Sequence, residues 1–253
     1  MADTISPALR ALLTNIIDYA GTFPPATLPC AQAAKNYASY LTSEHAWMLR
    51  WLVVSAADLP KVPASLDGKL SVLADADEPR AAAIESKRIF TCTKPVYCEV
   101  LLAQLNEVQQ AGSFAKIRTG SVKPDGIPSV EEVAKFIVTC AELKLPFKAT
   151  AGLHHPIRAE YALTYETNSP RAVMHGFLNV FLAAAFAWAG ETNIIPILSE
   201  TDPKAFRFDE LAHWRDRSLT VEQLQAARQQ LIHSFGSCSF TEPVEDLQKW
   251  GWL

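Results

Sequence analysis

The chain has 253 residues, of which 49% are hydrophobic and 20% charged, an ordinary composition for a globular protein with a sizeable core. Its net charge of −4, with no basic cluster, argues against nucleic acid or an anionic membrane as partner. No apolar run reaches membrane-spanning length and the first residues lack a signal pattern, so we expect a cytoplasmic protein.

The first part of the chain predicts helices that alternate with strands. Helices are expected over residues 7–18, 31–41, 78–86 and 103–110, and strands around residue 19 and over residues 50–54, 69–74 and 95–102. The strand at 95–102 carries Glu99 on the same face as Tyr97. Alternation of this kind is typical of α/β proteins.

The middle of the chain holds two apolar runs that each contain a lysine and end in glycine. They cover residues 114–120 and 147–152, and each reads as a strand that leaves a core for a loop. Between them, Ser129 and Glu132 form a capping box at the start of an apolar helix. Strand, helix and strand in this order predict two parallel strands.

The charges inside these strands are unusual. Alternation places Lys116 and Arg118 on one face with Phe114, and Lys148 on one face with Thr150. Because a parallel strand is covered on both faces, these lysines should be buried or line a cavity. A buried charge needs a partner, so either an ion pair or a functional site is expected, and two lysines beside an arginine favour a site.

The last part of the chain continues with a long apolar helix over residues 171–189, an ambiguous segment at 193–200 and a short strand at 206–208. A helix that ends near Gln230, a strand over 232–240 and a helix capped by Thr241 follow. Trp250 and Trp252 could pack on a second copy of the chain, so a homo-oligomer is possible.

Eight strands are counted in total. Their central residues are Tyr19, Leu52, Val72, Tyr97, Lys116, Lys148, Arg207 and Phe235. This number, with helices between most strands, predicts an α/β fold of the (β/α)8 TIM type as a single domain over residues 1–253.

Catalytic groups of such barrels lie at the carboxyl ends of the strands. The inward residues expected there are Glu99, Lys116, Arg118, Lys148 and Thr150. A second lysine and desolvation lower the pKa of an amine, which can then form a Schiff base with a carbonyl compound. A carboxylate such as Glu99 could carry the protons of that reaction.

These residues resemble a known family, the deoxyribose-phosphate aldolases within the class I aldolases. The run Lys116-Ile-Arg-Thr-Gly120 is similar to the Schiff-base strand of that family, and Lys148-Ala-Thr-Ala-Gly152 is similar to its next strand. The run Phe235-Gly-Ser-Cys-Ser239 resembles the final strand, which holds the substrate phosphate in the family.

The resemblance implies that Lys116 forms the imine and that Lys148 lowers its pKa, although the two roles could be reversed. It also implies an anion cradle made by Gly236, Ser237 and Ser239, with no cofactor. The expected activity is that of a carbon–carbon lyase acting on a small anionic carbonyl compound, phosphorylated or carboxylated. Arg118, which stands where the family has a small residue, would suit a carboxylate.

Three other hypotheses remain open. His154 and His155 could turn inward after Gly152 and bind a divalent metal in an isomerase, lyase or hydrolase, or could only contact substrate. Cys238 precedes a helix start, where a thiol becomes more acidic and can act as a nucleophile, although a buried small residue is the simpler interpretation. A non-catalytic barrel that binds an anionic metabolite is the third.

Overall fold

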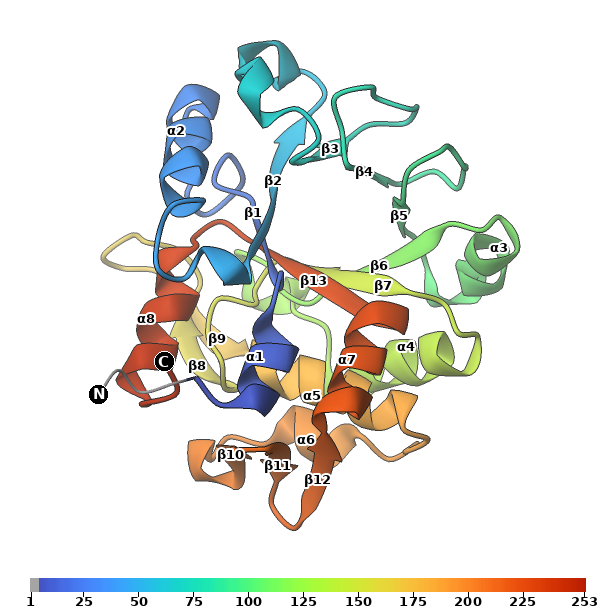
Figure 1. Ribbon diagram of the computed structural model, residues 1–253, viewed down its shortest axis with the longest axis vertical. Coiled ribbons are helices and arrows are strands. Elements are labelled where there is room, and N and C mark those ends of the chain that lie inside the picture. Colours follow the sequence, from blue (N-terminus) through green and yellow to red (C-terminus); the bar gives the residue numbers. More distant parts are fainter. Residues whose placement is uncertain (1–4) are drawn as a thin grey trace.

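The core of the protein is a closed barrel of eight parallel strands in the order β1-β13-β7-β6-β5-β4-β3-β2. The structure, a computed structural model, describes residues 5–253. The barrel strands are β1 (Ile17–Tyr19), β2 (Leu49–Ser55), β3 (Leu70–Leu73), β4 (Ala83–Ser86), β5 (Val96–Glu99), β6 (Phe114–Arg118), β7 (Phe147–Thr150) and β13 (Ile232–Ser237). The predicted (β/α)8 TIM-type barrel in a single domain is confirmed (Figure 1).

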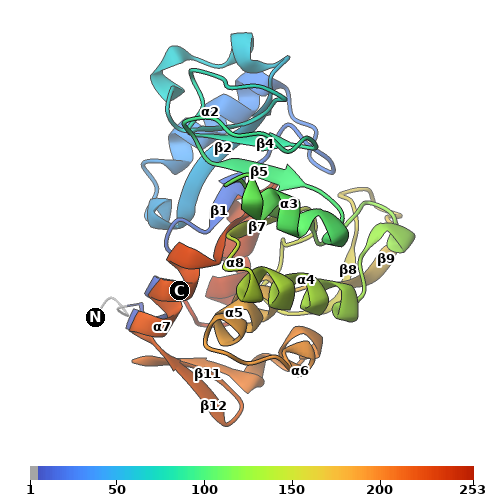
Figure 2. The ribbon, with the colours of Figure 1, turned by 90° about the vertical axis from the view of Figure 1, so that its right-hand side faces the viewer.

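Helices lie around the outside of the barrel. They are α1 (Pro7–Leu13), α2 (Cys30–Tyr40), α3 (Leu105–Gln110), α4 (Val130–Glu142), α5 (Phe177–Trp188), α6 (Ile195–Ser199), α7 (Val221–Gln230) and α8 (Thr241–Lys249). The apolar helix α5 lies between the barrel and α6 (Figure 2). Its Phe177 ring stacks on Phe235 of β13 with centroids 5.2 Å apart, because outward residues of β13 must be covered by an apolar surface.

The strand–helix–strand unit of the two lysines is formed as predicted. Lys116 and Lys148 are register partners on β6 and β7, and Glu99 of β5 is the register partner of Lys116. At the start of α4, Ser129 Oγ accepts a hydrogen bond from the backbone N–H of Glu132 at 3.2 Å, and Glu132 Oε2 accepts one from the backbone N–H of Ser129 at 2.7 Å. The capping box therefore fixes where the helix between the lysine strands begins.

One of the strands counted from the sequence does not belong to the barrel. Arg207 lies in β10 (Phe206–Phe208), which pairs antiparallel with β11 (Leu211–Trp214), and β11 pairs with β12 (Arg217–Thr220). This separate sheet lies at the lower edge of the molecule in Figures 1 and 2. A second small sheet, made by β8 (Ala159–Ala162) and β9 (Arg171–Met174), also interrupts the chain between β7 and β13.

The place of that strand in the barrel is taken by β4, in a segment for which the sequence predicted a helix. The expected helix over 78–86 is wrong, because Ala83 and Glu85 point into the barrel while Ile84 faces outward, an alternation that only a strand provides. Within the described residues, neither the connection 74–82 nor the connection 87–95 contains a helix.

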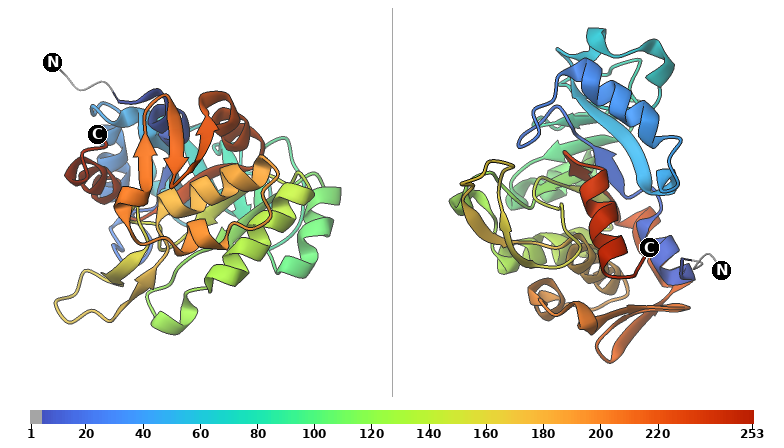
Figure 3. Two further views of the ribbon diagram at one scale, coloured as in Figure 1. Left: turned by 90° about the horizontal axis from the view of Figure 1, so that it is seen from below. Right: turned by 90° about the vertical axis from the view of Figure 1, so that its left-hand side faces the viewer.

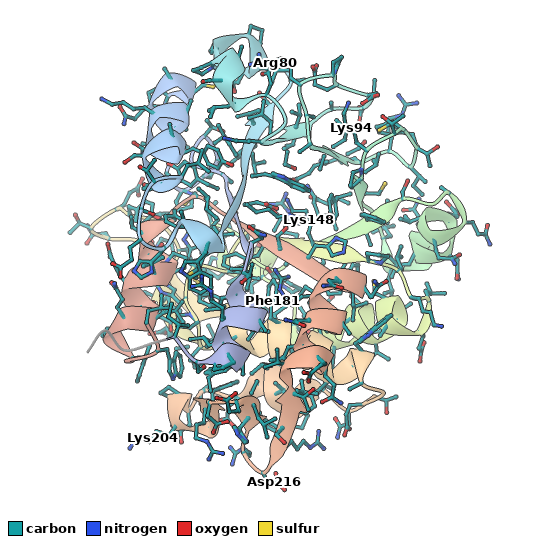
Figure 4. All side chains as sticks on the ribbon, viewed as in Figure 1. Arg80, Lys94, Lys148, Phe181, Lys204 and Asp216 are labelled. Atoms are coloured by element: carbon teal, nitrogen blue, oxygen red, sulfur yellow. The ribbon has the colours of Figure 1, made fainter. Side chains whose placement is uncertain are left out.

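Polar anchors hold these two helix-free connections instead. Arg80 binds Asp67 and the backbone carbonyls of Leu59 and Val62, and Lys94 binds Asp77 at 2.7 Å. Figure 4 shows Arg80 and Lys94 on this outer side of the barrel. The connections therefore cover β3 to β5 without a regular element.

Several element boundaries differ from the predictions. The first helix ends at Leu13, not at residue 18, and Asp18 lies in β1. The helix expected over 171–189 begins only at Phe177, after β9. The last strand ends at Ser237, and α8 has Phe240 rather than Thr241 at its N-cap.

The ambiguous segment 193–200 contains the short helix α6, with Pro196 in its first turn. No helix among residues 5–253 is long and apolar enough to cross a bilayer. Trp252 packs edge-on against Phe208 at 5.7 Å, so part of the apolar C-terminus is buried within the chain itself.

Candidate active site

Six charged side chains form one ion-pair network: Lys148, Asp18, Glu85, Lys116 and Glu99, together with the half-exposed Arg118, which binds Glu99. Lys148 Nζ donates to Asp18 Oδ2 at 2.5 Å and to Glu85 Oε1 at 2.7 Å. Lys116 Nζ lies 3.0 Å from the second oxygen of Glu85 and 2.9 Å from Glu99 Oε2. Glu85 therefore bridges the two lysines, and Figure 4 shows Lys148 near the centre of the molecule.

The carboxylates that bind Lys148 are themselves fully hydrogen bonded. Asp18 also accepts from Ser234 Oγ at 2.6 Å and from the backbone N–H of Trp51 at 3.3 Å. Glu85 also accepts from Ser71 Oγ at 2.8 Å. Such partners are what a buried charge needs, because the barrel interior offers it little other solvation.

The network fixes the charge of its buried members. Burial alone would raise the pKa of Glu85, but the charges of Lys148 and Lys116 and the hydrogen bonds of Lys148 and Ser71 outweigh it and hold that pKa well below its usual range. Burial alone would lower the pKa of Lys148, but Asp18 and Glu85 outweigh it and raise that pKa. Glu85 is therefore a carboxylate and Lys148 an ammonium.

An aromatic layer closes the barrel below this network. Tyr97 OH lies 2.7 Å from His233 Nδ1, and the Phe114 and His233 rings meet edge-on with centroids 5.4 Å apart. Arg50 donates to Ser234 Oγ at 2.9 Å. Burial and the positive charge of Arg50 lower the pKa of His233 to about 4, so this layer holds a neutral imidazole.

The two glycines that end the lysine strands lie against each other. A Cβ at Gly120 would be 2.5 Å from Gly152 Cα, and a Cβ at Gly152 would be 2.6 Å from Gly120 Cα. Beside them, Thr119 Oγ1 donates to the carbonyl of Ala151 at 2.7 Å. Ala151 and Gly152 have φ of 59° and 76°, so the chain turns sharply there toward His154.

A cavity of about 420 Å³ opens above the network, at the carboxyl ends of the barrel strands. The sequence-predicted site residues that line it are Lys116, Arg118, Thr150, His154, His155, Gly236 and Cys238. Hairpin residues of β8 and β9, with the segment between them, form one wall, and Figure 3 shows this hairpin beside α8. This is the face on which active sites of such barrels lie.

The other predicted site residues lie outside this lining. Lys148 is 0% exposed beneath the cavity, and Glu99 contacts the cavity only through its partners Lys116 and Arg118. Ser237 and Ser239 do not line it either, and Ser239 Oγ accepts from the backbone N–H of Glu242 in the first turn of α8. The predicted anion cradle thus reaches the cavity only at Gly236 and stays a prediction.

A second group of reactive side chains lies on the wall of the same cavity. His154 Nδ1 lies 2.7 Å from Glu242 Oε2, and His154 Nε2 lies 3.8 Å from Cys238 Sγ. Tyr165 OH is 3.4 Å from the same sulfur and 3.3 Å from Glu242 Oε2. His155 turns to a different carboxylate, with Nδ1 2.6 Å from Asp246 Oδ2. The two adjacent histidines both face the cavity, as predicted for a loop, and His155 Nε2 also lies 3.8 Å from Glu242 Oε1.

Among residues 5–253, no three side chains of the His, Cys, Asp or Glu type converge in a way that would hold a metal ion. The metal hypothesis for His154 and His155 therefore lacks a third ligand in the described part of the chain.

Asp18, Glu85 and Glu242 were not predicted as site residues. The first two are single acids in short strands, and Asp18, between Ile17 and Tyr19, gives the same signal that identified Lys148. Glu242 has no such signal, because an acid in the first turn of a helix is usually a solvated residue that favours the helix dipole.

Compared with protein-family models, curated proteins and solved structures, the chain gave no match in any of the three.

Proposed function

We propose that the protein is a Schiff-base-forming lyase in which Lys116 attacks a small anionic carbonyl compound bound in the cavity. The observation that carries the proposal is the position of Lys116, a lysine that is 6% exposed yet lines the cavity, in register with a second, deeper lysine. The local resemblance to the class I aldolases supports the same assignment.

Lys148 is the less suitable nucleophile. It is 0% exposed, and its raised pKa keeps it as an ammonium bound by Asp18 and Glu85, whereas only an uncharged amine attacks a carbonyl. Its role in the proposal is to fix Glu85, and through Glu85 to position the amine of Lys116. Lys116 thus keeps the imine-forming role that the resemblance suggests, whereas Lys148 has a positioning role in place of the one suggested for it.

The carboxylates around Lys116 suit the charge balance of imine formation. An ammonium and a carbonyl compound give an iminium ion and water, so one positive charge is present before and after the reaction. Glu99, whose side chain is 21% exposed, accepts the proton of Lys116 while the amine adds, and returns it when water leaves. Glu85 and Glu99 then stabilise the iminium as they stabilise the ammonium.

Arg118 favours an anionic substrate. Its guanidinium lines the cavity, its side chain is 53% exposed, and one of its nitrogens is 3.3 Å from Glu99 Oε1. Because Glu99 engages only part of the guanidinium, the remaining donors are free to bind a carboxylate or phosphate. The iminium can withdraw electrons from the adjacent carbon–carbon bond, and carbon–carbon cleavage is the reaction we propose.

Borohydride trapping tests this proposal. The protein is incubated with a panel of small aldehydes, keto acids and sugar phosphates, reduced, and analysed by intact mass and peptide mapping. We expect a reduced adduct on Lys116 for at least one anionic carbonyl compound, and none at that peptide in Lys116→Met. The variant Lys135→Met changes an exposed lysine of α4 and is the matched control.

An adduct on Lys148 would reverse the lysine roles. Tight binding of an anionic compound with no trapped adduct would favour the non-catalytic anion-binding barrel, the alternative that the same cavity supports.

A further inference from the structure

Cys238, His154 and Glu242 are arranged in the order found where a base activates a nucleophile. The sulfur lies beside one ring nitrogen of His154, and the carboxylate binds the other, so the carboxylate orients the imidazole toward the thiol. All three residues line the cavity, although His154 comes from the loop after β7, Cys238 from the segment between β13 and α8, and Glu242 from the first turn of α8. None of them is used in the lysine mechanism.

The charges of these groups favour a thiolate and an imidazolium. Burial alone would lower the pKa of His154, but the hydrogen bonds of Cys238 and Glu242 outweigh it and raise that pKa to about 9. Burial alone would raise the pKa of Cys238, but His154 and then Tyr165 outweigh it and lower that pKa. Both shifts favour the state in which the proton is on the His154 nitrogen rather than on the Cys238 sulfur.

The other cysteines lack this environment. Cys140 is 0% exposed and burial raises its pKa, and burial likewise raises the pKa values of Cys30 and Cys98. Cys92 is half-buried and does not line the cavity. Cys238 is the cysteine of this chain that lines the cavity.

We propose that Cys238, His154 and Glu242 form a second reactive centre of the cavity, a cysteine nucleophile that takes an acyl group from an ester or thioester. The bond from Sγ to the acyl carbon forms, the bond from that carbon to the leaving oxygen or sulfur breaks, and the His154 imidazolium gives its proton to the leaving group. Neutral His154 then takes a proton from a water molecule whose oxygen bonds to the acyl carbon. The bond from Sγ to that carbon breaks, a carboxylic acid is released, and the thiolate and imidazolium are restored. This reaction does not use Lys116.

The ionisation of the Cys238 sulfur is measured first, because that measurement needs no ligand. Thiolate absorbance in the far ultraviolet is recorded against pH for the wild type and for Cys238→Ser. We expect a difference of one thiolate at neutral pH that disappears only in acid, whereas an ordinary thiol ionises near pH ~8.5. In His154→Gln the same transition should move toward the ordinary value. Identical wild-type and Cys238→Ser absorbance below pH 8 would overturn the proposal.

Acyl transfer is measured with p-nitrophenyl acetate. We expect a burst of one equivalent of nitrophenolate at neutral pH and one acetyl group that maps to Cys238, with Cys92 of the same digest as the internal reference thiol. In His154→Gln the burst rate should fall about tenfold or more, because the thiolate fraction falls. An acetyl group on Cys92, on a lysine, or on no residue would overturn the assignment. Since the label maps by peptide, this result is separate from a failure to trap an imine on Lys116.

Discussion

Lys148 shows how one residue can support a site that it does not touch. Its ammonium is the common partner of Asp18 and Glu85, both of which are nearly or fully buried. In Lys148→Met, two buried carboxylates lose that partner, so we expect the free energy of unfolding to fall by about 3–5 kcal/mol. Urea denaturation followed by circular dichroism measures it.

The exposed control Lys135→Met should change the free energy of unfolding by no more than about 0.5 kcal/mol. A loss below about 1 kcal/mol for Lys148→Met would mean that Asp18 and Glu85 find other partners.

The pKa of Glu85 gives a pH dependence with a defined sign. Because that pKa is lower in the folded state than the unfolded value of about 4.3, the ionised group stabilises the fold at every pH above that value. This stability is lost as the pH falls through the folded pKa. Glu85→Gln should therefore cost about 3 kcal/mol near neutral pH, and the gap to the wild type should narrow in acid below about pH 4.

Unfolding curves of wild type, Glu85→Gln and the exposed control Glu166→Gln, measured at a series of pH values, check this expectation. For the control, a nearly constant and small difference is expected. A gap for Glu85→Gln that widens in acid would contradict the sign.

The sequence indicated the lysines and Glu99 but not Asp18 and Glu85, for a physical reason. A lysine flanked by apolar residues breaks a strand pattern and is expensive to bury, so it is visible without knowledge of the fold. Asp18 gives the same signal, but the preceding segment extends a helix pattern as far as residue 18, and the left-handed Asn15 that ends the turn is not visible in the pattern. For Glu85, alanine-rich neighbours favoured a helix, and closure of the barrel outweighed that local preference.

At the scale of elements, the contact between Gly120 and Gly152 allows the chain segments that follow β6 and β7 to lie close together. Gly152 and Gly112 share left-handed backbones, with φ of 76° and 69°, but a Cβ at Gly112 meets nothing within 4 Å. Gly112→Ala should therefore cost only the backbone strain of roughly 1–2 kcal/mol. Gly152→Ala should cost this strain plus about 1–3 kcal/mol for the overlap with Gly120.

Thermal or urea unfolding of the two variants separates these contributions, and Gly120→Ala reports the overlap without the left-handed strain. Equal losses for Gly112→Ala and Gly152→Ala would show that the strands can move apart at no cost.

Elements with a strong local signal were predicted better than elements that exist through pairing alone. The capping box of Ser129 and Glu132 located α4, whereas β9 was read as the first turn of the following helix. Nothing in the four residues of β9 specifies a strand, since their partner is β8 and the two strands stabilise each other. The same holds for β10, whose place outside the barrel depends on β11.

At the scale of the whole molecule, the barrel is covered unevenly. Helix α5 packs against β13 and against α4, α6 and α7, whereas β3 to β5 are joined by the helix-free connections 74–82 and 87–95. On the side of β3 to β5, local opening of the structure breaks fewer buried contacts. We expect amide hydrogen exchange in β4 to be faster than in β7 and β13.

Exchange followed by mass spectrometry on peptides of the native protein checks this order, with α5 as the slowest reference. Equal protection of β4 and β13 would show that the barrel opens only as one unit.

The barrel has the expected eight strands, although the strand of Arg207, β10, was counted among them in place of β4. The alternation of apolar strands and connecting segments is enough to predict the fold class. It does not identify which segments form the barrel strands, because that depends on how the sheet closes. The cavity itself could not be predicted, since its wall comes from a hairpin between β7 and β13 whose position depends on tertiary packing.

That hairpin has a consequence for how the protein can diversify. The strands β8 and β9 pair only with each other and not with the barrel, yet Tyr161, Tyr165, Arg171 and Met174 on or beside them face the cavity. Insertions or exchanges in residues 159–174 can thus reshape the entrance while the ion-pair network below keeps its geometry. The barrel thus holds the buried charges in place, and the hairpin is the part through which the ligand preference of the cavity can change.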